Sequence, residues 1–130
     1  MPEIFSHRFK VPASAIDARE HVNNLTYLEW CLDAAEKHWI SKANEDIRSK
    51  YIWYVLKHTI NYKAPSFLGE ELEIETWVTS AKGVKSERNY RIFRVKDDKT
   101  LIEAQTEWCL LDSKTQRPIR ITDEIRTLFA

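Results

Sequence analysis

The residues best suited to chemistry lie in a short polar stretch that precedes a long helical pattern. Asp17 supplies a carboxylate, His21 an imidazole, and Asn23 and Asn24 two carboxamides. A carboxylate can act as a nucleophile or a general base, and free amides at a helix N-terminus can polarise a carbonyl group. This pattern therefore indicates a site that acts on an electrophilic carbonyl. The simpler interpretation is that these side chains only satisfy turn and cap amides, with His21 at the surface.

A long amphipathic helix is predicted to position this stretch. It runs from Asn24 to about Ser41, and Asn23 or Asn24 can cap it. Apolar residues recur at helical spacing along one arc, namely Leu25, Leu28, Cys31, Leu32, Ala35 and Trp39. Charged residues fall on the opposite arc, namely Glu29, Asp33, Glu36 and Lys37. We expect the apolar arc to pack on the rest of the protein and the charged arc to face solvent.

Five extended segments are predicted around this helix. Alternating side chains and Gly, Pro or Asp turns place them at residues 4–11, 51–63, 71–82, 85–96 and 100–112. In the second segment the even positions 52, 54, 56, 60 and 62 are expected to share one face. Residues 44–46 are expected to form a polar connection, and a short helix is expected from Thr122 to Phe129. This order predicts an α+β fold, one long helix packed on a five-stranded antiparallel sheet, in a single domain of residues 1–130.

Composition argues against several classes of protein. The 20 Lys and Arg residues balance the 20 Asp and Glu residues, so no overall field attracts nucleic acid or an anionic membrane. No apolar run approaches the roughly 20 residues that span a bilayer, and the first residues do not resemble a signal peptide. Neither the two cysteines nor the four histidines have disulfide or metal-ligand spacing. A cytoplasmic protein without a bound metal is expected.

A second copy of the chain is expected to complete the fold. One helix covers too little of a five-stranded sheet. In addition, the segment that begins at Tyr51 is apolar on both faces, with Trp53 and Val55 opposite Tyr54 and Leu56. Such a strand favours burial against another subunit. We therefore expect a homodimer or a homotetramer.

The polar stretch and the start of the helix also carry a motif. It reads Asp-x-x-x-His-Val-Asn-Asn-x-x-Tyr-Leu-x-Trp, from Asp17 to Trp30. The chain thereby resembles the hotdog-fold acyl thioesterases of the 4-hydroxybenzoyl-CoA thioesterase type and the related acyl-carrier-protein thioesterases. Two further matches are Lys85-Ser86 and the closing segment Arg117-Pro118-Ile119-Arg120-Ile121 with Asp123-Glu124-Ile125-Arg126. The resemblance covers essentially the whole chain and implies a hotdog fold that hydrolyses acyl thioesters.

The resemblance implies roles for the residues of the motif. Asp17 matches the acid that acts as nucleophile or general base, and the backbone N–H near Asn24 matches the donor that polarises the thioester carbonyl. His21 and Asn23 match positions close to the reaction centre, where they would orient Asp17 or a water molecule. The implied substrate is an acyl-CoA or an acyl carrier protein. No cofactor is expected beyond the coenzyme A or phosphopantetheine of that substrate.

Other residues are candidates to bind the substrate. Tyr27, Trp30 and Tyr54 could line an acyl chain that lies between helix and sheet or along a subunit seam, although aromatic stripes are more often ordinary core. Ser86 is a further candidate, as part of the matched Lys-Ser pair. Basic residues could meet coenzyme phosphates at the surface, namely Lys82, Lys85, Arg117 and Arg120. Each of these alone is more often a solvated charge than a phosphate ligand.

The chain departs from the family pattern at three positions. Glu20 stands where many relatives have Gly, Ala15 where some have an acid, and Arg19 where the plant enzymes have Asn. Another hotdog subfamily uses an acid on the long helix, but the helix acids here fall on the charged arc. Two alternatives remain. One is a hotdog module that binds acyl thioesters without turnover, and the other is a dehydratase, which would need a differently placed His and acid pair.

Overall fold

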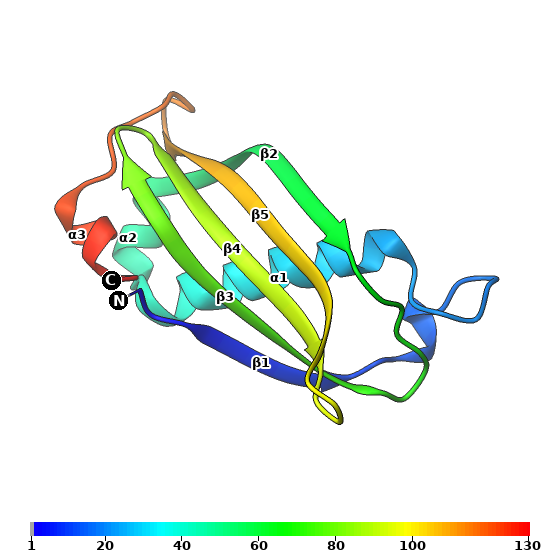
Figure 1. Ribbon diagram of the computed structural model, residues 1–130. Coiled ribbons are helices and arrows are strands. Elements are labelled where there is room, and N and C mark those ends of the chain that lie inside the picture. The colour runs from blue at the N-terminus through cyan, green and yellow to red at the C-terminus, as the bar shows by residue number, and fades with distance from the viewer. Residues whose placement is uncertain (1) are drawn as a thin grey trace.

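The computed structural model describes residues 2–130, in which a long helix crosses one face of an antiparallel sheet (Figure 1). The strands are β1 (Phe5–Lys10), β2 (Tyr51–Tyr62), β3 (Glu71–Lys82), β4 (Lys85–Arg94) and β5 (Lys99–Asp112), in the order β1-β3-β4-β5-β2. The helices are α1 (Asn24–Lys42), α2 (Glu45–Lys50) and α3 (Asp123–Thr127), and a 3-10 turn, η1 (Ala13–Ala15), follows β1. The predicted α+β architecture with five strands is confirmed. No helix among the described residues is long and apolar enough to cross a bilayer.

The main core lies between α1 and the inner face of the sheet. Leu72 and Ile74 of β3 and Ile92 of β4 are fully buried there, because alternate residues of a strand point to the same face. The acidic residues between them on β3 point outward as predicted, and Glu73 pairs with Arg8 of β1 at 2.9 Å. A smaller core joins the end of α1 to α2, β5 and α3. The sheet thus has one apolar and one charged face.

The buried face of α1 differs from the predicted arc. Cys31 and Ala35 are buried as predicted, but Leu25 is 68% exposed. The buried residues are Tyr27, Cys31, Ala34, Ala35 and His38. The predicted arc did not include Tyr27, Ala34 or His38, and two of these, Tyr27 and His38, carry polar atoms. Those atoms have partners inside the protein, so the two side chains can be buried.

Strand β2 changes face at a β-bulge. Its register with β5 shifts between Val55 and Lys57, so Leu56 is an extra residue in the strand. Before the bulge Trp53 and Val55 face the helix side, whereas after it Ile60 does. The predicted single face of even positions is therefore wrong. Apolar residues of this edge strand are left exposed, namely Ile52, Tyr54, Leu56 and Tyr62. The expectation that a second subunit covers them stays a prediction.

Two helices begin at capping side chains. The polar stretch after α1 is a helix start and not a plain connection, because Asn44 Oδ1 accepts a hydrogen bond from Ile47 N–H at 2.9 Å and α2 follows. Thr122 caps α3 as predicted, and its Oγ1 accepts from Ile125 N–H at 3.2 Å. These caps fix the starts of α2 and α3, whose Ile47 and Ile125 belong to the smaller core.

His38 on α1 is completely buried in a polar network. Arg88 Nη1 lies 2.9 Å from His38 Nδ1, and a guanidinium can only donate, so Nδ1 accepts. The proton of the neutral ring is therefore on Nε2, which faces Glu3 Oε1 at 3.2 Å. Burial first, and then the positive charge of Arg88, lowers the pKa of His38 from 6.5 to about 4.

Acid is therefore expected to destabilise the folded protein. The unfolded chain protonates His38 near pH 6.5 and the folded chain only near pH 4, so between these values the unfolded state binds more protons. The free energy of unfolding should fall by about 3 kcal/mol as the pH drops across this window. Urea denaturation at a series of pH values measures the loss. His38→Gln should remove most of it, and an equal loss in that variant would contradict the explanation.

Candidate active site

The predicted chemical residues form a short loop before α1. Ile16 and Val22 make an isolated antiparallel bridge, and Asp17 N–H donates to the carbonyl of His21 at 3.0 Å. The Asp17 carboxylate accepts from the N–H of Arg19 at 2.9 Å, so the loop holds it in place. His21 Nδ1 lies 3.9 Å from Asp17 Oδ1. The structure thus brings the acid and the imidazole together, both only partly exposed.

Glu20, which stands where many relatives have Gly, lies at the tip of this loop. Its φ is +66°, in the left-handed region where a Cβ is disfavoured. Glu20 N–H donates to the Asp17 carbonyl at 3.0 Å, so this conformation closes the turn. Glycine would adopt it without strain. The position therefore requires a left-handed backbone conformation, and Glu20 adopts this conformation on an exposed turn.

The two asparagines at the start of α1 have different roles. Asn23 is the cap, because its Oδ1 accepts from Leu25 N–H at 2.8 Å and its carbonyl accepts from Thr26 N–H at 3.0 Å. In residues 2–130 no acceptor is found for the backbone N–H of Asn24. That N–H is one of the first-turn donors that a helix cannot satisfy internally. It is free to donate to a group that approaches the helix N-terminus.

A small hollow lies beside this free donor. It has a volume of about 220 Å³, and His21, Asn24, Tyr27 and Tyr62 are among the residues that line it. Tyr62 Oη donates to the carbonyl of Asn24 at 3.1 Å, and Tyr27 Oη lies 2.6 Å from Ser66 Oγ. These contacts hold both rings at the wall of the hollow. Of the predicted substrate-binding residues, Tyr27 is therefore beside the helix start.

The other predicted binding residues lie elsewhere in the chain. Trp30 packs on Phe9, with ring centroids 4.7 Å apart, and is not among the residues that line the hollow. Tyr54 is 59% exposed on β2, because it alternates with Trp53 and Val55, which face the helix side. Ser86 is buried and lines a different, larger cavity. Within one chain the structure does not bring these three side chains to the hollow.

The predicted phosphate-binding residues gather at the far end of the sheet. Lys82 and Lys85 flank the β3–β4 turn, and the segment that carries Arg117 and Arg120 runs past this turn, where Ile121 N–H donates to the Gly83 carbonyl at 2.8 Å. Lys85 also lies 3.4 Å from Glu107. Figure 1 shows this turn and the loop before α1 at opposite ends of the molecule. The segments that carry the four residues therefore lie near one end of the sheet, away from Asp17 of the same chain.

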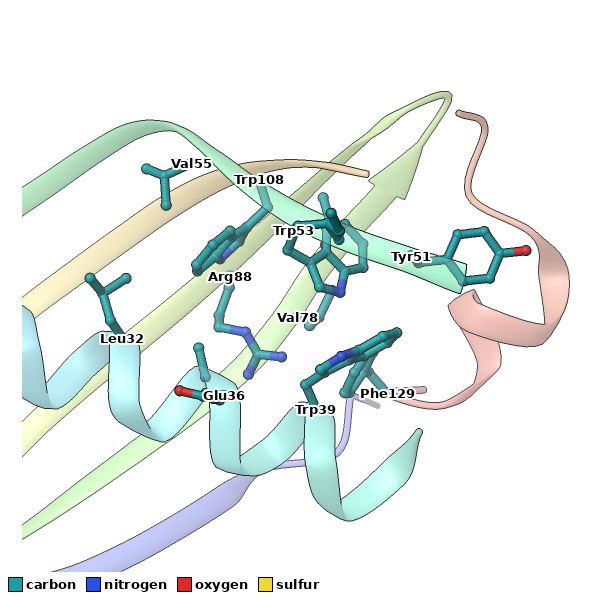
Figure 2. A pocket seen from close by; sticks show the side chains of 13 residues that line it. Leu32, Glu36, Trp39, Tyr51, Trp53, Val55, Val78, Arg88, Trp108 and Phe129 are labelled. Atoms are coloured by element: carbon teal, nitrogen blue, oxygen red, sulfur yellow. The ribbon is translucent and has the colours of Figure 1, made fainter. Parts of the chain in front are cut away.

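Sequence reasoning missed the larger cavity, between α1 and the sheet (Figure 2). Its volume is about 390 Å³, and aromatic side chains form much of its wall, namely Trp39, Tyr51, Trp53, Trp108 and Phe129. Arg88 of β4 also lines it. The signal for this residue was present in the alternation of β4, because Ser86, Arg88 and Tyr90 share the buried face. No cluster of three His, Cys, Asp or Glu side chains that could hold a metal ion occurs in the described part of the chain.

The chain is similar in sequence to known thioester hydrolases. Residues 2–129 match the family described as acyl-ACP thioesterase N-terminal domain. The chain is 31% identical over 75 residues to the chloroplastic acyl-[acyl-carrier-protein] hydrolase FATB3 of Cuphea viscosissima, a match that covers 58% of this chain and 18% of that protein. It is 25% identical over 124 residues to the long-chain acyl-CoA thioesterase FadM of Escherichia coli, over 92% of each chain.

A solved structure shows the same fold. The 1,4-dihydroxy-2-naphthoyl-CoA thioesterase Slr0204 from Synechocystis superposes with a TM-score of 0.85 at 18% identity, over 97% of this chain and 95% of that one. At such identity the likeness concerns the fold alone. It confirms the predicted hotdog fold.

Proposed function

Because the chain belongs to the acyl-ACP thioesterase family, a family of thioester hydrolases, we propose that it cleaves an acyl-CoA or an acyl carrier protein at the start of α1. One observation carries this assignment, the unused N–H of Asn24 next to the loop that holds Asp17. The chain spans only 18% of the plant hydrolase but nearly all of the bacterial acyl-CoA thioesterase. Both kinds of acyl thioester are therefore candidate substrates.

The proposed reaction starts with a polarised carbonyl. The thioester oxygen accepts the Asn24 N–H, and the positive end of the α1 dipole stabilises the negative charge that develops on it. Asp17 then attacks the carbonyl carbon, or removes a proton from a water molecule that does so. The C–S bond breaks, and the thiolate leaves and takes up a proton. If Asp17 attacks, loss of the thiolate leaves an acyl–Asp17 anhydride, and water then hydrolyses it to the free acid and restores the carboxylate. If water attacks directly, its oxygen enters the acid in one step and the proton taken by Asp17 passes to the thiolate. No cofactor is used beyond the coenzyme or phosphopantetheine of the substrate.

Neighbouring side chains support this arrangement. His21, 3.9 Å from the Asp17 carboxylate, can orient that group or the water. Asn23 acts indirectly, because its cap keeps the first turn of α1 formed and the Asn24 N–H in place. Tyr27 and Tyr62 form part of the wall of the hollow beside which the thioester carbonyl would lie.

A second copy of the chain could bring the basic residues to this site. Two β2 edge strands that pair antiparallel across a two-fold axis would place the β3–β4 turn of one copy near the Asp17 loop of the other. The exposed apolar side chains of β2 favour such pairing. In the homodimer, or in a tetramer of such dimers, Lys82, Lys85, Arg117 and Arg120 would meet the coenzyme phosphates bound by the partner.

Thiol release from a panel of acyl-CoAs and acyl carrier proteins tests the proposed function. We expect hydrolysis with a clear optimum in acyl length, and the same preparation should sediment as a dimer or tetramer. Tight stoichiometric binding without thiol release would instead identify a binding module. Absence of both binding and turnover across the panel would contradict the assignment.

A further inference from the structure

The larger cavity contains a buried arginine. Arg88 is 5% exposed, and its guanidinium reaches from the sheet toward α1 (Figure 2). Arg88 Cζ lies 5.3 Å from the centroid of the Phe129 ring, one of the aromatic walls. The cavity, of about 390 Å³, falls in the size range of small-molecule sites. It is therefore an aromatic space with a fixed positive charge.

Arg88 uses only part of its donors on the protein. Its Nη1 donates to His38 Nδ1 at 2.9 Å and to Thr76 Oγ1 at 3.0 Å. From residue 2 to residue 130, no acceptor lies within hydrogen-bond range of Nε or Nη2, and neither atom is fully enclosed by protein. The Nε and Nη2 donors lie side by side on one edge of the guanidinium. That edge matches the two oxygens of a carboxylate.

The charges around Arg88 leave one positive charge unbalanced. His38 is neutral at physiological pH, because it accepts from Arg88 and its pKa is lowered to about 4. Behind it, Glu3 is shared with a second cation, Lys42. Glu36 lines the cavity but is exposed, and it makes no ion pair with Arg88 within the described structure. A buried charge without a counter-ion is costly, so a ligand that supplies a negative charge is favoured.

We propose that this cavity binds a carboxylate on the Nε and Nη2 edge of Arg88, with the rest of the ligand packed on the aromatic walls. Two sources can supply that group. One is the far end of a dicarboxylic acyl group whose other end is the thioester, and this source rests on the proposed function. The other is a free carboxylic acid, the class of compound that thioester hydrolysis releases.

Pairs of acyl-CoAs with equal carbon number test the first source. One member of each pair ends in a methyl group and the other in a carboxylate. A hydrogen-bonded charge pair of this kind is worth about 10- to 100-fold in binding, so kcat/KM should favour the carboxylate by about that factor at the chain length that fits. The methyl ester of the same diacid keeps the acyl chain and its terminal carbonyl but loses the charge, and it should lose the preference.

Calorimetry with free carboxylic acids and the matching primary alcohols tests the second source. Tighter binding of the acid by about tenfold or more, without any preference among the acyl-CoAs, assigns the site to the free acid. This arm needs no catalysis. Absence of thiol release would therefore refute only the proposed function. Equal binding of acid and alcohol, together with equal kcat/KM for both acyl-CoA series, would overturn the carboxylate site.

Substitution of Arg88 locates the effect. In Arg88→Met the ratio between carboxylate and methyl ligands should fall to about one, and Arg88→Lys, which keeps the charge but not the paired donors, should retain part of it. Arg91→Met is the matched control. Arg91 lies on the same strand as Arg88 but on the outer face of the sheet, with its Cζ 4.2 Å from the Phe93 centroid. It should change neither ratio. A full preference in a folded Arg88→Met would overturn the proposal, and if that variant does not fold, the ester comparison decides.

Discussion

Asp17→Asn is expected to lower the rate of thiol release by about 10²- to 10⁴-fold, because a carboxamide can neither attack the thioester nor accept a proton from water. The fold should persist. Asn can accept the Arg19 N–H through the same oxygen position that Asp17 uses at 2.9 Å, so the loop keeps its turn. Steady-state kinetics with a thiol reagent measures the rate, and urea denaturation measures the stability.

Asp33→Asn is the matched control for this substitution. Asp33 is an exposed acid on α1 that pairs with Lys37 at 2.7 Å, away from the loop. The same change from acid to amide there should leave the rate within about twofold, because surface ion pairs contribute little. Wild-type turnover by a folded Asp17→Asn protein would refute the role proposed for the carboxylate.

The strands and the starts of α1 and α3 were predictable because their signals are local, whereas the six-residue α2 was missed. Alternation along β3 and the turn at Gly83 require only neighbouring residues, and so does the presence of a capping asparagine, Asn23 or Asn24, before α1. The bulge at Leu56 is different. It depends on how β2 fits the partner strand β5, and nothing within the segment itself reports that fit. A single extra residue then reversed the faces expected for half of the strand.

Burial of polar groups was the main source of error on α1. A helix face is read from apolar residues, yet His38 and Tyr27 are buried because groups distant in sequence satisfy them. The same holds for Arg88, which reaches Thr76 and His38 from β4. Such partners come together only in the folded chain. Sequence patterns therefore missed part of the buried face of the helix and the charged cavity beside it.

The candidate site was predictable in part. Asp17, His21 and the asparagines lie within eight positions, so any turn before the helix brings them together. The motif could not say which asparagine caps the helix and which leaves its amide free. Whether the basic residues near the β3–β4 turn reach Asp17 depends on how far apart the two ends of the sheet lie. Within one chain these residues and Asp17 are at opposite ends. Their part in binding therefore depends on how two copies assemble.

The free amide of Asn24 can be removed without disturbing the helix. Asn24 is the first residue of α1, a position that proline favours because its missing N–H has no partner within the helix. Asn23 before it has φ −63° and ψ 136°, an extended conformation that suits a residue preceding proline. Asn24→Pro should therefore fold normally, and thiol release should fall by about 10²- to 10³-fold, the effect of losing one carbonyl donor. Steady-state kinetics on the folded variant measures this loss.

Asn24→Ala separates the backbone from the side chain at the same position. It removes the carboxamide but keeps the N–H, so its rate should stay far closer to that of the wild type than the rate of Asn24→Pro. If the two variants lose activity equally, the side chain carries the effect and the backbone donor does not. If Asn24→Pro is fully active, the thioester carbonyl is polarised elsewhere. The N-terminus of α1 would then position Asp17 but not take part in the chemistry.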